Sequence, residues 1–174
     1  SIALDMILGE ADRTSLKALQ DNIRSDFGYH VDIKDVPSKI IDNDATLADT
    51  LSKGPIVLGF EFLFQEPDEI FSSCVLHPLT IAWVQKAASN SYRELFFRAK
   101  SVVCNLDKFS KSVSYSGFLN GTPDSDGILR RMPLLIKYGD SYYPNLALAS
   151  IIQATDNRQL RFVRKESGQS YFFL

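Results

Sequence analysis

Two short apolar runs constrain the fold of this 174-residue chain more than any other feature. Residues 2–8 read Ile-Ala-Leu-Asp-Met-Ile-Leu, and residues 56–64 read Ile-Val-Leu-Gly-Phe-Glu-Phe-Leu-Phe. Runs of this length and composition are typical of strands covered on both faces, so residues 2–8 are expected to lie centrally in a sheet. A helical pattern separates the two runs. The resulting β-α-β order predicts that they are parallel neighbours in one sheet.

The intervening helix has clear signals at both ends. Asp12 or Thr14 is expected to cap its start, and Gly28 suits its end. Its apolar residues fall on one stripe at helical spacing, and they are Leu16, Leu19, Ile23 and Phe27. Residues 29–43 show no sustained period and are predicted to be an insertion or long loop. A second, short helix is predicted from Asp44 to Lys53.

The middle of the chain carries weaker signals. Residues 79–84 and 102–105 are predicted as strands, residues 91–100 as a helix capped by Ser91, and residues 107–113 as helical turns. In the last third, residues 115–120 and 128–138 are strand-like and flank a turn-rich segment, which predicts a hairpin.

A second turn at Gly139-Asp140 leads to a helix over residues 145–154, and Pro144 directly before it suits the start of a helix. This helix is apolar on nearly all sides, which predicts deep packing. Residues 159–165 and 170–174 are expected to form a final strand pair. The predicted fold class is therefore α/β, a mixed β-sheet with helices packed on it and a C-terminal β-hairpin region.

Composition limits the function classes. The chain is 45% hydrophobic and 23% charged, with a formal net charge of −2, and it is long enough to form one domain over residues 1–174. The charge balance argues against a nucleic-acid partner and against charge-driven binding to a membrane surface. No apolar run is long enough to span a bilayer. Both ends are abrupt, so we expect a piece of a longer protein, with membrane attachment only through flanking helices absent from this chain.

The usual catalytic and cofactor signatures are missing from the sequence. The two histidines, His30 and His77, have no second histidine or cysteine at metal-ligand spacing, so no metal site is expected. The sequence contains no Gly-x-Ser-x-Gly elbow and no phosphate loop. The segment Thr122-x-Asp124-x-Asp126-Gly127 begins like a calcium loop, but Pro133 occupies the position of the final carboxylate ligand. We therefore predict a protein that is not an enzyme and uses no cofactor.

Five charged residues are the candidate ligand contacts: Asp5, Asp124, Asp126, Arg130 and Arg131. Asp124 and Asp126 are expected to fix a tight turn through their own backbone, with Gly127 at positive φ. Arg130 and Arg131 are expected to point to opposite faces of a strand, so that only one of them can face a given pocket. An acidic turn beside two guanidinium groups is alternatively a small-anion site or an intramolecular clamp.

Asp5 and Glu61 each interrupt an apolar strand. Such a carboxylate is exposed at a strand end, paired, or placed in a ligand crevice. Ligands of open α/β sheets bind beyond the carboxyl ends of the strands, which makes Asp5 the better candidate. The sequence leaves open whether the two cysteines, Cys74 and Cys104, form a disulfide or remain buried free thiols.

The last third resembles a known family. The matching segments are Gly117-Phe-Leu-Asn120, then Pro123-Asp124-Ser-Asp126-Gly127-Ile-Leu-Arg130-Arg131-Met-Pro133-Leu134, then Gly139 and Tyr143-Pro144-Asn-Leu146-Ala147-Leu148-Ala149. This pattern is similar to that of the second CHASE family, the cyclase and histidine-kinase associated sensory extracellular domains. Residues 3–8, 44–48 and 56–59 agree more loosely with the same family.

The resemblance implies an extracytoplasmic, periplasmic or extracellular, input domain of a bacterial membrane receptor. Flanking transmembrane helices would anchor it, and a cytoplasmic cyclase, kinase or cyclic-dinucleotide enzyme would receive the signal. The expected partner is a small molecule of unknown identity. The alternatives are a dimerisation or structural module that pairs with a second copy and binds no ligand, and, ranked last, a small hydrolase.

Overall fold

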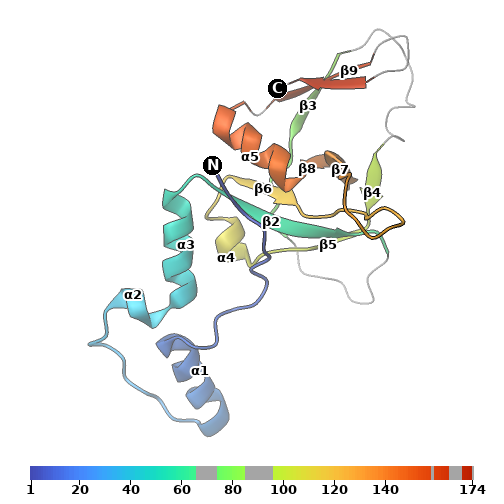
Figure 1. The fold of residues 1–174 in the computed structure, drawn as a ribbon. Helices are drawn as coiled ribbons and strands as arrows, with labels where there is room; N and C mark the ends of the chain where they lie inside the picture. The colour runs from blue at the N-terminus through green and yellow to red at the C-terminus, as the bar shows by residue number, and fades with distance from the viewer. Residues whose placement is uncertain (66–73, 85–95, 158, 165–169, 174) are drawn as a thin grey trace.

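The computed structural model describes residues 1–65, 74–84, 96–157, 159–164 and 170–173. The described helices are α1 (Leu16–Phe27), α2 (Ser38–Ile41), α3 (Asn43–Lys53), α4 (Asp107–Ser110) and α5 (Leu146–Thr155). The described strands are β1 (Ile2–Leu4), β2 (Ile56–Leu63), β3 (Thr80–Val84), β4 (Phe97–Ala99), β5 (Ser101–Val103), β6 (Tyr115–Phe118), β7 (Leu135–Tyr138), β8 (Ser141–Pro144), β9 (Gln159–Arg164) and β10 (Ser170–Phe173). The α/β class is confirmed (Figure 1).

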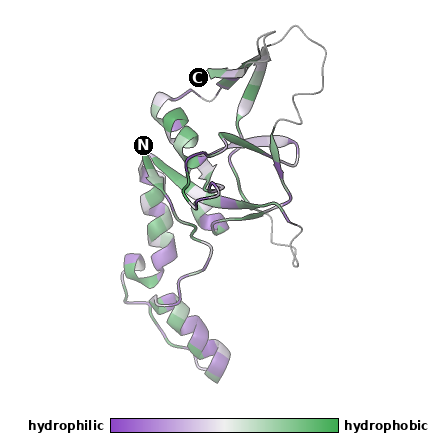
Figure 2. Cartoon of the chain, turned by 45° about the vertical axis from the view of Figure 1, so that its right-hand side comes forward, coloured by the Kyte–Doolittle hydropathy of each residue, from purple (hydrophilic) through white to green (hydrophobic). Residues whose placement is uncertain are grey.

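The central sheet is built around β2. This strand pairs in parallel with β1 and with β6, and its last residues pair antiparallel with β5, so the sheet is mixed as predicted. Val57, Leu58, Phe60 and Phe62 of β2 are buried. Phe60 and Phe62 pack with Phe118 and Tyr143 in one core cluster, while Leu58 packs with Leu51 and Phe109 in another. Figure 2 shows hydrophobic residues running through this sheet and α5.

The first predicted strand is shorter and less central than expected. β1 ends at Leu4, pairs only with β2 among the described strands, and leaves Ile2 53% exposed. Its continuation leaves the sheet, and at Leu8 it is held by buried Asn105, whose Oδ1 accepts from Leu8 N at 2.7 Å and whose Nδ2 donates to Gly59 O at 2.8 Å. Leu8 O accepts from Leu106 N at 2.8 Å, so the end of the run contacts the segment after β5 instead of extending the ladder with β2.

Two smaller sheets flank the central one. β9 pairs antiparallel with β10 and parallel with β3, which confirms the predicted C-terminal strand pair. β7 pairs antiparallel with β8 across the Gly139 turn and parallel with β4. Because β4 covers residues 97–99, the helix predicted over 91–100 is wrong there, and its first half lies outside the described residues.

The predicted hairpin between residues 115–120 and 128–138 does not form. β6 inserts beside β2, and β7 begins only at Leu135 and pairs with β4 and β8. The segment between them is a loop that leaves the sheet at Asn120, whose side-chain amide bonds both backbone polar groups of Phe62 at 2.8 Å. Asn120 therefore completes the pairing with β2 that a longer strand would have made.

Helix α5 starts one residue later than predicted. Pro144 is the last residue of β8, and buried Asn145 is the N-cap, accepting from Leu148 N at 2.8 Å. The Asn145 amide also donates to Pro133 O at 3.0 Å, which ties the preceding loop to the helix. Leu148, Ala149 and Ile152 are buried, but Ile151 is 49% exposed. The helix thus buries one face, which corrects the prediction of packing on nearly all sides.

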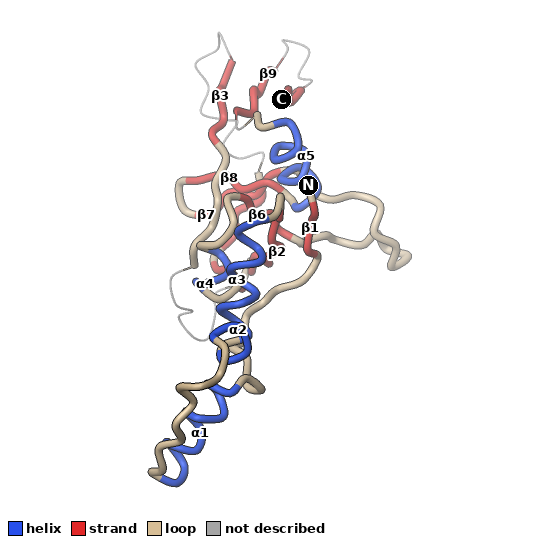
Figure 3. The backbone as a smooth tube through the Cα atoms, turned by 90° about the vertical axis from the view of Figure 1, so that its left-hand side faces the viewer, coloured by secondary structure: helices blue, strands red, loops and turns tan. Residues whose placement is uncertain are grey.

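Helices α1 and α2 extend away from the sheets, at the end of the molecule opposite both termini (Figures 1 and 3). α1 begins at Ser15, whose hydroxyl accepts from Ala18 N, rather than at the predicted caps Asp12 or Thr14. It ends at Gly28 in the left-handed conformation, as predicted. Residues 29–42 are a loop that contains α2, and α3 starts at Asn43, one residue before the predicted Asp44.

Cys74 and Cys104 form a disulfide. This answers the question that the sequence left open. The bridge joins the segment before β3 to the residue that follows β5. Both half-cystines pack against the core cluster of Phe60 and Phe62.

Candidate functional site

The acidic turn and its two arginines form a compact cluster. Gly127 has φ 81°, its N–H donates to Asp124 O, and the Asp126 carboxylate accepts from Ile128 N at 3.1 Å. The turn, the positive φ of Gly127 and the role of Asp126 match the prediction, whereas the described bonds of the Asp124 carboxylate come from the two arginines and not from the backbone. Arg130 donates to Asp124 at 3.2 Å and to Asp126 at 2.9 Å, and Arg131 donates to Asp124 at 2.6 Å.

The two arginines do not point to opposite faces as predicted. That expectation assumed a strand, and residues 128–133 form none, so both guanidinium groups turn back onto Asp124. Hydrogen bonds from Arg130 and from the backbone N–H of Ile128 lower the pKa of Asp126. In turn, the carboxylates of Asp126 and Asp124 raise the pKa of Arg130. The cluster neutralises its own charges, which is the intramolecular clamp among the alternatives considered.

Asp5 lies directly after β1, at the end of the strand where it was predicted. Its side chain is exposed, and no described hydrogen bond or ion pair joins it to the turn of Asp124–Arg131. The structure therefore brings together four of the five candidate residues and leaves Asp5 apart from them. Glu61 is likewise exposed on β2.

Other residues of the family-like segment, residues 117–149, hold neighbouring backbone segments in place. Gly117 lies beside the start of α5, and a Cβ at this position would come within 2.6 Å of Leu146 Cα and 2.7 Å of Asn145 O. Asn120 bonds β2, and Asn145 caps α5 while holding Pro133. These three residues join β2, β6 and α5, so the segment has a structural role beyond any contact with a ligand.

A cavity of about 260 Å³ lies where the central sheet meets the β3–β9–β10 sheet. It is lined by Leu76, His77, Pro78, Leu79, Thr80, Ser114, Tyr115, Ser116, Pro144, Ala149 and Ile152. The imidazole Nδ1 of His77 lies 3.0 Å from the hydroxyl of buried Ser116. The wall is thus apolar on the side of α5 and carries hydroxyl and imidazole groups on the side of β6.

The chemistry of this cavity limits what it can hold. Among the described residues that line it there is no Asp, Glu, Lys or Arg, so these residues offer no fixed charge to balance a strongly charged ligand. Its volume lies just below the range of about 300–1,000 Å³ typical of drug-sized ligands. It suits a small molecule with an apolar body and a few hydrogen-bonding groups.

The sequence carries no signal for this cavity. The spacing of His77 argues against a metal ligand, and no Gly-x-Ser-x-Gly elbow nominates a serine to act with it. Ser116 lies inside a strand-like run, where a serine carries no functional signal of its own. The cavity arises from residues of four elements that meet only in the fold, so no local pattern points to it.

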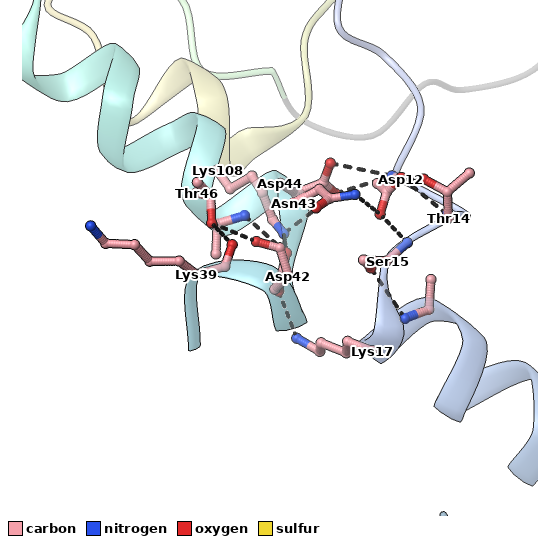
Figure 4. A network of polar contacts seen from close by, with 12 residues as sticks. Asp12, Thr14, Ser15, Lys17, Lys39, Asp42, Asn43, Asp44, Thr46 and Lys108 are labelled. Carbon is pink, nitrogen blue, oxygen red and sulfur yellow. Dashed lines mark hydrogen bonds and ion pairs between the residues drawn. The ribbon is translucent and has the colours of Figure 1, made fainter. Parts of the chain in front are cut away.

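A second polar network fixes the base of α1 against α3 and α4 (Figure 4). Asp12 accepts from Thr14 N, Ser15 N and the Asn43 amide, and its own N–H donates to Asp44. Lys17 bonds Asp42 at 3.0 Å, and Lys108 lies 3.7 Å from Asp42 and 3.5 Å from Asp44.

Hydrogen bonds set the electrostatics of this network. Those from Thr14 and Ser15 lower the pKa of Asp12, and those from Ala45 N and Lys17 lower the pKa of Asp42.

Across the described ranges, no group of three or more His, Cys, Asp or Glu side chains could hold a metal ion. None of the helices built from these residues is long and apolar enough to cross a membrane.

Comparison with known proteins gives one match. The model of the CHASE2 domain family matches residues 1–172, almost the whole chain. No curated protein and no solved structure matches.

Proposed function

This chain belongs to the CHASE2 family of sensory extracellular domains, and from that premise we propose that it is the extracytoplasmic input domain of a bacterial transmembrane receptor. Residues 1–174 act together as one sensor domain. Flanking transmembrane helices anchor it, and a cytoplasmic cyclase, kinase or cyclic-dinucleotide enzyme receives its signal.

The observation that carries the ligand-binding part of the proposal is the cavity beside His77. It lies between two sheets and against α5, so a bound molecule contacts elements of both. A ligand shifts a conformational equilibrium only by its differential affinity for the two states. A site between two packed units meets this requirement, because a small relative movement changes the shape of the cavity. We propose a small, uncharged or weakly charged molecule as the signal.

The five residues singled out by the sequence keep a place in this proposal: Asp5, Asp124, Asp126, Arg130 and Arg131. A ligand role for them stays a prediction. Their geometry favours a structural role for the acidic turn, because the carboxylates already accept from the two guanidinium groups. An anion at this turn would have to compete with those bonds.

A thermal-shift screen tests the proposal. The chain is melted with amino acids, organic acids, sugars, nucleotides and divalent ions, and the screen is repeated on Ser114→Trp. Ser114 is an exposed residue at the cavity, so its replacement blocks the site without disturbing the core. Ser52→Trp, exposed on α3 and outside the cavity, is the matched control. A ligand at about 100 times its Kd stabilises the fold by about 2.7 kcal/mol.

The variants distinguish the outcomes. A compound that stabilises wild type and Ser52→Trp but not Ser114→Trp supports the cavity as the sensing site. A compound whose effect disappears in Arg131→Ala or Asp126→Ala, but survives in Ser114→Trp, moves the site to the acidic turn. If no compound stabilises the chain, the non-ligand-binding alternative, a dimerisation or structural module, is favoured instead. The exposed apolar face of α1 is the observation that supports that alternative.

A further inference from the structure

Helix α1 exposes an apolar stripe that no other part of the described chain covers. Leu16, Leu19 and Phe27 are 36%, 52% and 71% exposed, and α1 has no buried residue. With 3.6 residues per turn, these side chains and Ile23 project from one side of the helix. An amphipathic helix of a folded domain normally turns such a stripe toward the core. Here no residue of the stripe belongs to any of the three hydrophobic clusters.

The direction of the stripe is fixed at the base of the helix. Asp12, Ser15 and Lys17 bind α3 or the turn before α1, as seen in Figure 4. Gln20, which at 100° per residue lies between Phe27 and Arg24, donates to Val31 O at 2.5 Å and so holds the returning loop against α1 on the Arg24 edge of the stripe. Helix α1 is therefore a positioned projection rather than a loosely attached segment.

Opposite charges flank the stripe. At 100° per residue, Arg24 lies along one edge of the apolar side and Asp26 along the other. Both residues are exposed, and neither forms an ion pair within the described part of the chain. A second α1 laid against the first can pair these charges in only one of two directions.

We propose that two copies of the chain associate through α1 as a parallel, two-fold symmetric helix pair. In this arrangement Leu19, Ile23 and Phe27 each meet their own counterparts, and the two edges of the stripe face each other. Arg24 of one copy then faces Asp26 of the second copy, twice by symmetry. An antiparallel two-fold pair would instead bring each edge against itself, so that Arg24 would face the basic edge of the other helix.

The position of the termini supports the same direction. Both termini lie at the end of the molecule opposite α1 (Figures 1 and 3). A parallel pair keeps the termini of both copies at one end, as two receptor chains in one membrane require, whereas an antiparallel pair sends them to opposite ends. The proposal does not depend on the His77 cavity and stands whether or not that cavity binds a ligand.

One exposed stripe of a 12-residue helix is smaller than the roughly 800 Å² per partner of a stable interface, so the isolated chains associate weakly. Membrane attachment raises the effective concentration to the order of 1 mM. Sedimentation equilibrium is therefore measured up to about 1 mM chain, where wild type is expected to form dimers. A wild type that stays monomeric at this concentration overturns the proposal.

Charge exchange tests the pairing directly. Arg24→Asp and Asp26→Arg each place like charges across the interface and are expected to weaken dimerisation by about tenfold or more. The double variant restores the opposite pairs and should recover the wild-type constant. Asp26→Arg favours the isolated helix, because a cation near its C-terminus suits the helix dipole. Weakening by this variant therefore cannot come from loss of α1.

A control variant and cross-linking complete the test. Ile128→Glu replaces an apolar residue 53% exposed outside α1 and should leave dimerisation unchanged. Under oxidation, Leu19→Cys should form a disulfide between two identical chains. A cross-link between Leu16→Cys and Phe27→Cys chains, without the Leu19→Cys homodimer, would show an antiparallel pair. Failure of the double charge variant to recover association would equally contradict the proposal.

Discussion

At the scale of single residues, the family-like segment serves mainly to position backbone. Gly117, Asn120 and Asn145 each act on a neighbouring strand or helix terminus. The sequence predicted the acidic turn and the positive φ of Gly127, because these depend on local backbone chemistry. It could not predict that Arg130 and Arg131 share Asp124, because that depends on the chain leaving the strand conformation. For the same reason the cavity beside His77 had no local signal.

We predict that Gly117→Ala lowers the free energy of unfolding by about 2–3 kcal/mol, because the new methyl group meets backbone atoms that cannot yield. Gly121→Ala is the matched control. Its Cβ would come within 2.7 Å of Leu129 Cδ1, the end of a flexible and exposed side chain. Urea unfolding of both variants measures the difference. Equal effects would show that the approach of β6 to α5 is looser than described.

At the scale of elements, the parallel pair of β1 and β2 and the β9–β10 pair were predicted correctly, whereas the extent of β1 and the pairing of residues 115–138 were not. β2, α3 and the β9–β10 pair formed where the pattern placed them, because each has its own periodicity and end signals. The hairpin between residues 115–120 and 128–138 was wrong, because β6 finds a better partner in β2, which is distant in sequence. Similarly, residues 5–8 do not continue β1, and Leu8 bonds the Asn105 side chain and Leu106 N, which are also distant in sequence.

The attachment of α1 is predicted to depend on pH. The pKa values of Asp12 and Asp42 are lowered by the hydrogen bonds that they accept. Their contribution is therefore complete above the unfolded-state pKa of about 4 and is lost as the pH falls through the lower folded values. Cα chemical shifts of α1 residues should move toward coil values between about pH 5 and pH 2.

Matched variants separate this effect from general acid unfolding. Asp12→Asn should weaken α1 already at neutral pH and reduce the pH dependence. Asp35→Asn removes an exposed aspartate that makes no described hydrogen bond or ion pair, and it should behave as wild type. Unchanged α1 shifts in acid, in a chain whose β2 resonances remain native, would contradict the role of the carboxylates.

The disulfide is predicted to contribute substantially to stability. It closes a loop with a sequence separation of 30 residues, for which chain entropy gives about 3–4 kcal/mol. The double variant Cys74→Ser/Cys104→Ser should lose that amount in urea unfolding. Wild type measured under reducing conditions should match the double variant. A loss below about 1 kcal/mol would mean that the unfolded chain already holds these segments together.

At the scale of the whole molecule, the core and the α1–α2 projection are separable. None of the three hydrophobic clusters includes a residue between Gly9 and Leu47. The two ends of the projection meet, because Asn43 donates to the Asp12 carboxylate. The α/β class and the family followed from the sequence, whereas this division did not, since the stripe of α1 looked like any core-facing helix.

Replacing residues 13–41 by a short Gly-Ser linker should therefore leave a folded core. The expected change in Tm is within about 2–4 °C, equivalent to about 1 kcal/mol or less for a domain of about this size. The same variant should be monomeric wherever wild type dimerises, and it should retain any ligand that the His77 cavity binds. Loss of cooperative unfolding would show that the projection belongs to the core.

The disulfide also has a consequence for the order of assembly. A chain that emerges amino end first presents Cys74 and Cys104 before β6 and every later element exist. In an oxidising compartment the bridge can close at that stage, with β2 and β5 already available to pair. β6 then pairs in parallel with a β2 that the disulfide and β5 already hold in place. The slow step, the pairing of two strands distant in sequence, therefore requires only β6 to find its position.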